Sequence, residues 1–331
     1  MKKLSILIPR YKEDESIVCY LLDSIKIQQA IDFNDIEVVI AQDGLEQEPL
    51  SQEFINSYKD RFDIRYVKFE HGGISAIRNH LLDISCGEYV QFCDDDDMFS
   101  SVLGLKVIFD KINNGGFEAL FSTFTEEYYN KDLNKRFFVL HENDCIFVHG
   151  KVFNKQFLID NNIRFKNEIK FHEDVYFIAQ CYHCSNPNKR VFITTPFYIW
   201  KWRDGSVVRS DPKWLMNTYH ILLDSNESLV ENFLKRGMIE QVEMFSFIIT
   251  FNMYYKINLP QYCLPENQER VLEIEKRFKK FYVKYVDYMD KMPADKQQRF
   301  IASLRDKAVA EGLMIEHITF EDWIKRILSY D

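Results

Sequence analysis

The sequence predicts an α/β fold, with a mostly parallel central sheet flanked by helices, followed by an all-helical C-terminal domain. Through the first 200 residues, short apolar runs typical of buried strands alternate with segments that repeat apolar residues at helical spacing. Strands that are apolar throughout are typical of parallel sheets whose two faces are both covered. From about residue 210 onward, proline and glycine become scarce and helical periodicity dominates.

Each element follows from its own pattern. Continuous apolar runs predict four buried strands before residue 100, at 4–9, 36–41, 64–69 and 88–93. Helical spacing predicts helices over residues 73–84 and over 16–29, where Ser16 is the expected N-cap. Beyond residue 100 we expect strands at 117–123, 135–141 and 191–199, and helices at 155–161, 174–184 and 266–289. The helical domain would then occupy residues 210–331.

The distribution of charge along the chain argues against some classes of function. The formal net charge of −9 lies entirely in the first 200 residues, which carry 22 basic and 31 acidic side chains. An acidic half of the chain argues against a broad nucleic-acid footprint, and it suits a site that recruits a cation. Residues 201–331 carry 20 side chains of each sign, which does not favour an anchor for anionic lipid.

The expected location is the cytoplasm. The first residues do not follow the pattern of a signal peptide, and we expect no transmembrane segment, which takes about 18 apolar residues. Seven scattered cysteines, an odd number, suit a reducing compartment. The interpretation leaves room for peripheral association with the inner face of the membrane and for a homo-oligomer formed through the helical domain.

Four consecutive aspartates, Asp94 to Asp97, directly follow the fourth predicted strand. Ligands of parallel sheets sit at the carboxyl ends of the strands, so we expect these acids and Asp43 at one edge of the sheet. Adjacent like charges repel one another, and no packing need explains them. Oxygen ligands suit Mg²⁺ and Mn²⁺, which bridge to diphosphate oxygens. The alternative is a solvated acidic turn or the start of a helix.

Three weaker signals accompany the acidic run. Glu173 and Asp174 lie among apolar residues, where a carboxylate near a metal could act as a general base, although a helix N-terminus also favours acids. Gly72 and Gly73 allow a close backbone approach, and Arg78 follows where it could pair with phosphate or with the aspartates. The basic, glycine-containing stretch 201–209 could close over a diphosphate, or it could be a linker.

Taken in order, these segments resemble the inverting glycosyltransferases of the GT-A fold, in the large family two that includes bacterial polysaccharide and wall-polymer enzymes. The resemblance covers about residues 3–210. Residues 4–11 (LSILIPRY) are similar to that family's opening strand, and 36–44 (IEVVIAQDG) to its second strand and donor-base loop. Its glycine-rich helix and metal motif are matched by 71–79 and 86–97, its acceptor-side segment by 150–165 and 171–177, and its closing loop by 198–206.

The resemblance implies a role for each matching position. Pro9, Tyr11, Glu13 and Asp43 would line the base and ribose pocket of the donor nucleotide, and Gly73 and Asp95 would also contact the donor. Asp96 and Asp94 would coordinate Mn²⁺ or Mg²⁺, and Arg78 would brace them. Asp174 would be the catalytic base, oriented by Glu173, which could instead contact the acceptor. Arg203, Ser206 and Arg209 would bind the diphosphate.

The implied activity is metal-dependent transfer of a sugar, with inversion, from a nucleoside-diphosphate sugar to a saccharide or polymer acceptor. Residues 1–209 would form the catalytic domain, with the donor half at about 1–97 and the acceptor half at about 98–209. Residues 210–331 would serve acceptor recognition or assembly. Two departures touch the donor pocket: Arg10-Tyr11-Lys12 stands where the family often has Thr-Tyr-Asn, and residues 42–45 (QDGL) stand where paired acids and a serine are frequent.

Two other functions remain to be separated from this one. A sugar-nucleotide nucleotidyltransferase shares a related fold and a metal–diphosphate site, but such enzymes usually hold the triphosphate in a glycine-rich, basic first loop. Residues 9–15 contain no glycine and are net acidic. A catalytically silent module that binds sugar nucleotides or polysaccharide predicts loss of the acidic run or of the candidate base, and both are present.

Overall fold

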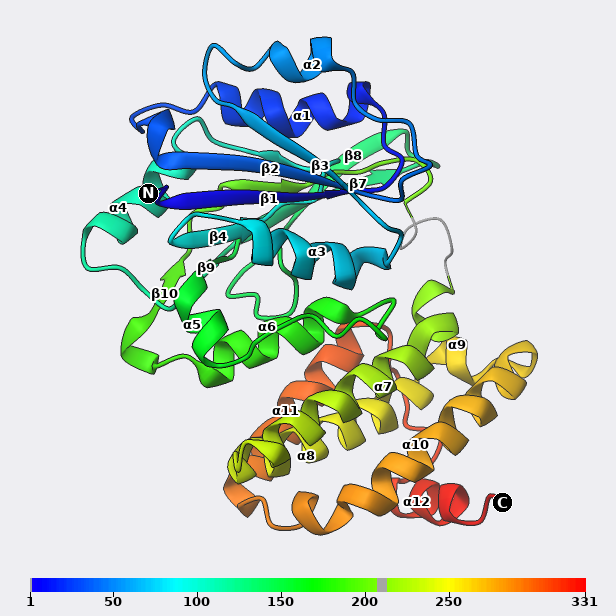
Figure 1. Ribbon diagram of the computed structural model, residues 1–331. Coiled ribbons are helices and arrows are strands. Elements are labelled where there is room, and N and C mark those ends of the chain that lie inside the picture. Colours follow the sequence, from blue (N-terminus) through cyan, green and yellow to red (C-terminus); the bar gives the residue numbers. More distant parts are fainter. Residues whose placement is uncertain (1, 207–212) are drawn as a thin grey trace. The chain divides into compact units, whose positions relative to one another are not determined.

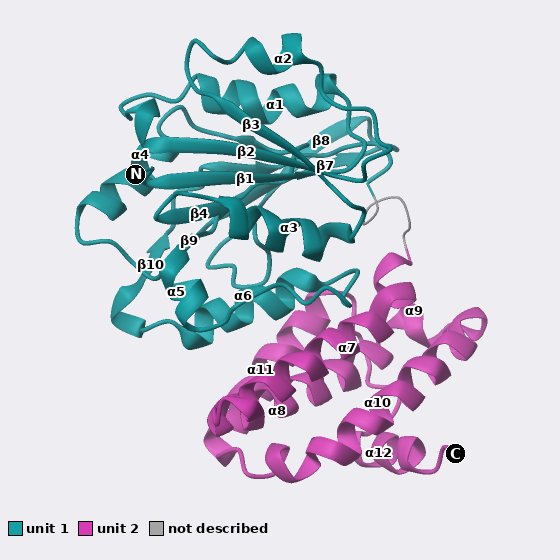
Figure 2. Ribbon diagram, viewed as in Figure 1, with its two compact units in different colours: residues 1–210 teal, residues 211–331 magenta. Residues whose placement is uncertain are grey.

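The computed structural model describes residues 2–206 and 213–331, and the chain divides into two compact units, residues 1–210 and 211–331 (Figure 2). The first unit is built on two sheets. The larger has seven strands in the order β10-β6-β9-β4-β1-β2-β3 (Figure 1). Its strands are β1 (Leu4–Arg10), β2 (Ile36–Asp43), β3 (Ile64–Phe69), β4 (Tyr89–Phe92), β6 (Ala119–Ser122), β9 (Val152–Asn154) and β10 (Arg190–Ile193).

The larger sheet is mostly parallel, as the apolar runs predicted. β1 pairs in parallel with both β2 and β4, and β2 pairs in parallel with β3. β9 is the exception, because it lies antiparallel between β4 and β6. β1 and β2 are largely buried along their whole length, because alternate side chains enter opposite layers of the core. Ile6 and Ile8 pack on one side, and Leu7 on the other.

Helices cover both faces of this sheet. α1 (Glu15–Lys26), α2 (Gln52–Asn56) and α4 (Gly104–Asn113) contribute apolar side chains to one core layer. The other layer receives side chains from α3 (Gly73–Ile84), α5 (Lys155–Asp160) and α6 (Glu173–Cys184). In Figure 1, α1 and α2 lie on one side of β1 and β2, and α3 lies on the other. The fold class predicted for this part is confirmed.

A smaller second sheet has the order β5-β11-β7-β8. Its strands are β5 (Met98–Phe99), β7 (Phe124–Asn130), β8 (Lys135–His141) and β11 (Tyr198–Trp200). β11 pairs in parallel with β7, whereas β7 and β8 form an antiparallel hairpin. β5 follows the acidic run directly, so this sheet carries one end of that run.

The second unit is helical, as predicted. Its helices are α7 (Trp214–Lys235), α8 (Ile239–Ile257), α9 (Pro260–Cys263), α10 (Gln268–Met289), α11 (Ala294–Ala310) and α12 (Phe320–Leu328). Three short 3₁₀ turns complete the described chain, two in the first unit at Phe33–Asp35 and Pro187–Lys189 and one in the second at Pro265–Asn267.

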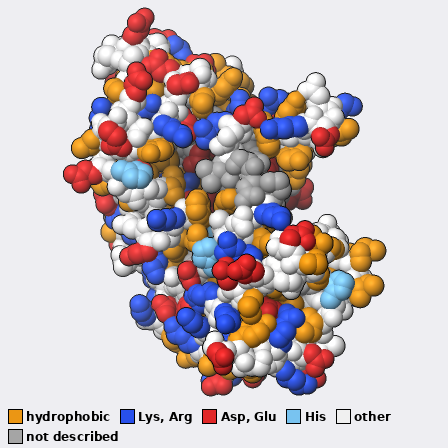
Figure 3. Space-filling view, turned by 90° about the vertical axis from the view of Figure 1, so that its right-hand side faces the viewer, with side chains coloured by type: hydrophobic (Ala, Val, Ile, Leu, Met, Phe, Trp, Pro, Cys, Tyr) orange, Lys and Arg blue, Asp and Glu red, His pale blue; other side chains and the backbone are white. Residues whose placement is uncertain are grey.

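None of the helices within the described residues combines the length and the apolar character that crossing a bilayer requires. Basic and acidic side chains are interspersed over the face shown in Figure 3.

Two local predictions were wrong. The single strand expected at 191–199 is two strands, β10 and β11, which belong to different sheets. Pro196 lies between them, and proline lacks the N–H that a continuous strand would use. The N-cap of α1 is Asp14 rather than Ser16, because the Asp14 carboxylate accepts a hydrogen bond from the Ser16 backbone N–H.

Candidate active site

The candidate site begins where neighbouring strands of the large sheet end. β1 lies between β2 and β4, and all three run in the same direction. Asp43 is the last residue of β2, and the acidic run starts two residues after β4 ends. The sheet therefore brings Asp43 and the four aspartates to one edge, as the order of strands in the sequence predicted.

Arg78 on α3 connects the acidic run to the candidate base. Its Nη2 donates to Asp94 Oδ1 at 2.9 Å, and its Nη1 donates to Glu173 Oε1 and Asp174 Oδ1, each at 2.8 Å. The arginine side chain is only 3% exposed. Burial opposes its charged form, but attraction by the three carboxylates outweighs burial and raises the pKa of Arg78. A permanently charged, forked donor is suited to holding several carboxylates in fixed positions.

Glu173 and Asp174 open α6, and the chain reaches them through a left-handed residue. His172 precedes the helix with φ 61° and ψ 23°, a conformation that side chains other than glycine rarely adopt. Burial lowers the pKa of His172 to about 4, so its imidazole is neutral near pH 7. Burial and the neighbouring Asp174 raise the pKa of Glu173 to about 7, although Arg78 opposes the shift.

Asp174 is fixed from a second direction by the loop that precedes β9. The Val148 backbone N–H donates to Asp174 Oδ2 at 3.0 Å. The loop is closed by a buried ion pair between Lys151 and Asp144, at 2.6 Å, and Asp144 also accepts from the Phe147 N–H. Both oxygens of Asp174 therefore accept hydrogen bonds, and its side chain is 14% exposed. The carboxylate has a fixed direction and keeps access to solvent.

The aspartates of the acidic run have different surroundings. Asp95 is buried, and burial together with the charge of Glu13 raises its pKa well above the ordinary range. Asp96 forms an ion pair with Arg203, with 2.7 Å between Oδ2 and Nε. Burial and repulsion by Asp97 and Asp94 nevertheless raise the pKa of Asp96 to about 7. Burial and mutual repulsion therefore both oppose the ionised forms of Asp95 and Asp96.

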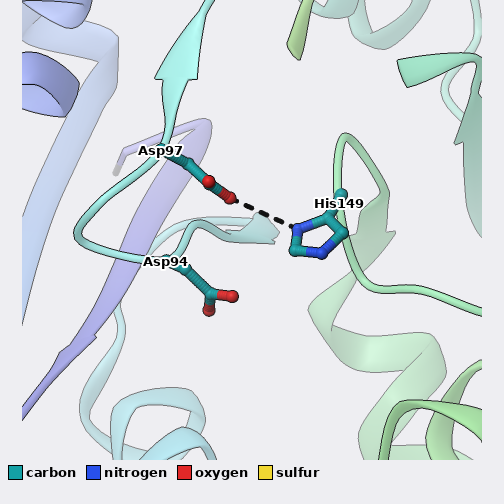
Figure 4. A group of neighbouring side chains, drawn as sticks. All are labelled: Asp94, Asp97 and His149. Atoms are coloured by element: carbon teal, nitrogen blue, oxygen red, sulfur yellow. Dashed lines mark ion pairs between the residues drawn. The ribbon is translucent and has the colours of Figure 1, made fainter. Parts of the chain in front are cut away.

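Asp97 points toward the second sheet. It is fully buried, and it accepts from the Tyr198 hydroxyl and from the Lys201 N–H, both at 2.9 Å. His149 Nδ1 lies 3.4 Å from Asp97 Oδ2, and an atom of Asp94 is within 4.8 Å of both groups (Figure 4). Asp94, Asp97 and His149 thus offer one arrangement of metal-ligand atoms. Because both Asp97 oxygens already accept protein hydrogen bonds, we assign Asp97 mainly to holding β11 and the closing loop.

The residues expected around the donor base occupy the end of β1 and β2. Asp43 accepts from the Gly72 and Gly73 N–H groups, at 2.8 and 3.1 Å, and pairs with His71 at 3.0 Å. Gly73 begins α3 with φ +81°, which is the reason for a glycine there. The ring of Tyr11 is 41% exposed and lies 5.4 Å from that of His71.

Glu13 ties this end of the sheet to the closing loop. It forms an ion pair with Arg203 at 2.9 Å, while Arg203 also holds Asp96. Pro9 is buried within β1. Ser206 donates its N–H to the Arg203 carbonyl in a turn, and the predicted Arg209 lies outside the described residues. Of the two predicted diphosphate ligands within the described residues, Arg203 forms an ion pair with the acidic run.

Comparison with known proteins identifies the family. The sequence profile described as Glycosyl transferase family 2 matches residues 5–182, more than half of the chain and all of the clustered acids above. The chain belongs to glycosyl transferase family 2. The family expected from the sequence is therefore confirmed.

Two curated relatives of this family 2 chain are named as glycosyltransferases. The poly(ribitol-phosphate) beta-glucosyltransferase of Bacillus spizizenii is 28% identical over 191 residues, which cover 54% of this chain and 29% of that protein. Glycosyltransferase GlyA of Streptococcus pneumoniae is 26% identical over 246 residues, which cover 67% of this chain and 33% of that protein. The chain therefore spans about a third of the length of these relatives.

Solved structures support the fold of the family 2 chain. The crystal structure of S. aureus TarS 1–349 in complex with UDP-GlcNAc has a TM-score of 0.66 at 17% identity, covering 98% of this chain and 90% of that one. A mannosyltransferase from Pyrobaculum calidifontis in complex with GDP-Man and Mn²⁺ has a TM-score of 0.50 at 12% identity, covering 98% and 84%. At such low identity, these similarities establish the GT-A fold and nothing finer.

Sequence reasoning missed several contacts of the candidate site in this family 2 chain. Arg10 is the last residue of β1, and it forms a buried pair with Gln42 on β2, in which Arg10 Nη1 donates to Gln42 Oε1 at 2.8 Å. The Tyr66 hydroxyl donates to the same oxygen. Arg10 and Gln42 are the positions at which the sequence departs from the family pattern. The signal for their contact was a charged residue, Arg10, at the end of an apolar strand. No sequence pattern pointed to His149 or to the Val148 N–H.

Proposed function

We propose that this chain is a metal-dependent, inverting glycosyltransferase that uses a nucleoside-diphosphate sugar, specifically a UDP-sugar, and a hydroxyl group of a saccharide or cell-surface polymer. One observation carries the proposal: Arg78 contacts both Asp94 of the candidate metal motif and the candidate base Asp174. A transferase needs its donor diphosphate and its acceptor base at a fixed separation, and a buried arginine between the two provides it.

The residues of the acidic run fit a divalent cation. Carboxylate oxygens are the ligands that Mg²⁺ and Mn²⁺ prefer. Within the described residues Asp95 Oδ2 is buried without a hydrogen-bond partner, and burial together with repulsion by Asp97 and Asp94 opposes the ionised form of Asp96, which a bound cation would favour. We assign the ion to Asp94 and Asp96, and we assign Asp95 to the donor. When bound, the ion would act as a Lewis acid that neutralises the departing diphosphate.

The protein's own groups would perform the remaining steps. Asp174 would take the proton of the acceptor hydroxyl, which attacks the anomeric carbon of the donor from the face opposite the diphosphate. Arg78 and the Val148 N–H orient that carboxylate, and Glu173 beside it would contact the acceptor or fix the base. Arg203 would exchange its ion pair with Asp96 for one with the diphosphate, which offers the guanidinium an anionic partner in place of the carboxylate. A single displacement of this kind inverts the anomeric configuration.

The relatives support the choice of donor and acceptor. TarS has been solved with UDP-GlcNAc, and the Bacillus spizizenii relative is named for a poly(ribitol-phosphate) acceptor. We extend both to this chain as a UDP-sugar donor and a polymeric or saccharide acceptor, acting in the cytoplasm. Residues 1–97 would hold the donor, residues 98–209 the acceptor, and the helical unit would recognise the acceptor or mediate assembly.

A nucleotide panel tests the donor assignment. Thermal unfolding would be measured with nucleoside diphosphates and their sugars, with and without Mn²⁺. A ligand at a hundredfold excess over its Kd stabilises the folded state by about 2.7 kcal/mol, so a clear rise in Tm is expected for the uridine compounds with metal. The absence of a shift with every nucleotide would contradict the proposal.

The Asp96→Asn variant is the control for the metal-dependent part of the nucleotide experiment. In this variant the metal-dependent shift should disappear. Without metal the variant should be more stable than wild type, because the raised pKa of Asp96 means that folding favours the protonated acid. In wild type, ionised Asp96 lowers the free energy of unfolding. This effect is absent below the pKa of about 4 that the side chain has in the unfolded chain, and it is complete above the pKa that it has in the folded protein. The advantage should therefore grow from about pH 4 to about pH 7 and then level off. Asp132→Asn, at an exposed position, should show neither effect.

A further inference from the structure

Strand β8 is exposed along nearly its whole length. Every residue from 135 to 140 is exposed, so neither face of the strand is covered. Its four central residues are apolar and between 43 and 61% exposed: Phe137, Phe138, Val139 and Leu140. Tyr128, which lies opposite Phe137 on β7, is 44% exposed and extends the apolar area. We call these five residues the hairpin patch.

The hairpin patch also lies at an open sheet edge. β8 is the last strand of the order β5-β11-β7-β8, so within the described part of the chain no strand lies beside its second edge. Proteins usually protect such edges with proline, bulges or central charges, because unpaired backbone groups recruit another strand. β8 contains no proline, and its pairing with β7 runs without a bulge from His141 to Lys135. Its lysine and arginine lie together at one end, at positions 135 and 136.

The sequence of β8 is complementary to itself when two copies run antiparallel. A twofold axis perpendicular to the sheet makes one residue face its own copy and pairs the others symmetrically about it. With Val139 on the axis, Phe138 faces Leu140 of the second copy, and Arg136 faces Glu142 of the second copy. Both ends then carry opposite charges across the seam, and the centre is apolar, which is the pattern that stabilises cross-strand pairs.

Shifting the register by one position of the axis removes the pairing of Arg136 with Glu142 of the second copy. With Phe138 on the axis, Arg136 would face Leu140 of the second copy, and Lys135 would face His141. Arg136 already pairs with Glu127 on β7, whose position opposite Phe138 puts it on the same face of the sheet as Arg136. In the register centred on Val139, the guanidinium would lie between two carboxylates, one from each copy.

We propose that this chain forms a twofold dimer in which β8 pairs antiparallel with β8 of a second copy, joining the two small sheets into one. The occupant is a second copy, because the register that places the apolar residues of β8 opposite one another also pairs Arg136 with Glu142. A single strand pair is smaller than the interface of about 1,600 Å² in a stable complex, so the dimer dissociates on dilution. The proposal is independent of the donor and acceptor chemistry.

Sedimentation velocity of the whole chain tests the dimer, at concentrations from about 1 to about 100 μM. Wild type should shift from monomer to dimer across this range. Val139→Lys puts two ammonium groups face to face on the axis and should raise the dissociation constant at least about tenfold. Val283→Lys, at an exposed valine of α10, is the matched control and should leave the equilibrium unchanged. A wild-type monomer at every concentration, or a dimer weakened only by Val283→Lys, overturns the proposal.

The register has its own test. Glu142→Arg alone should break the dimer, because Arg136 would face a like charge, and adding Arg136→Glu should restore it. Val139→Cys should form a disulfide between two copies under mild oxidation, because directly opposed residues have Cα atoms about 4.5–5.5 Å apart. Mass spectrometry would identify the peptide linked through position 139. A dimer that resists Glu142→Arg and does not link through position 139 contradicts this strand pairing.

Discussion

Replacing Asp174 with asparagine should nearly abolish sugar transfer while leaving donor binding intact. Asparagine has the same shape and can still accept from the Val148 N–H, but it cannot take a proton from the acceptor hydroxyl. Loss of a general base typically lowers the rate by about 10²–10⁴-fold. The measurement is acceptor-dependent release of the nucleoside diphosphate, together with the metal-dependent rise in Tm caused by the nucleotide.

The matched control for this variant is Asp160→Asn. Asp160 is exposed at the end of α5, and among the described residues its side chain accepts from Gln156 alone, one turn earlier on the same helix. Its turnover should equal that of wild type. Normal turnover in Asp174→Asn would remove Asp174 from the mechanism, and loss of nucleotide binding would show that the residue supports the fold of the donor site instead.

Replacing Arg78 with methionine should produce the largest loss of stability. The change leaves Asp94, Glu173 and Asp174 close together without their shared counter-charge. Removing one partner of a buried ion pair typically costs about 3–5 kcal/mol of the free energy of unfolding. The loss should be smaller at low pH, because the carboxylates can then be protonated and need no cation. Urea unfolding at two pH values measures both effects.

Two further substitutions separate charge from geometry at this position. Arg78→Lys keeps the charge but offers a single ammonium in place of the forked guanidinium, so its stability should fall between those of wild type and Arg78→Met. Arg65→Met, at an arginine whose side chain is 48% exposed, should change stability by less than about 1 kcal/mol. If Arg78→Met unfolds no more readily than Arg65→Met, the buried cluster does not hold the site together.

The first half of the fold was predictable because its strands and helices have unambiguous local patterns. The ranges expected for β3, α3 and β8 match the structure at both ends. Other elements carried weaker signals. β7 begins inside an aromatic stretch that also contains charged residues, and β9 has only three residues. Such segments become strands because neighbouring strands of the sheet pair with them. The local pattern of apolar residues does not reveal that pairing.

The site shows the same limit. The sequence could propose Asp94, Arg78 and Asp174 as candidates because each belongs to a short motif, and the structure brings these three together. The groups that orient them are backbone atoms and buried side chains on other elements, such as the Val148 N–H and Tyr198. Their contribution depends on where the chain passes in space, so a linear motif does not reveal it.

The most direct test of the account is the anomeric configuration of the product. Wild-type protein would be incubated with Mn²⁺, a saccharide or polyol-phosphate acceptor and the UDP-sugar selected by the nucleotide panel, and the new glycosidic bond would be assigned by proton NMR. A single base and a single displacement predict a β-linked product from an α-linked donor. An α-linked product would require a covalent or front-face route that this arrangement of Arg78 and Asp174 does not provide, and it would contradict the account.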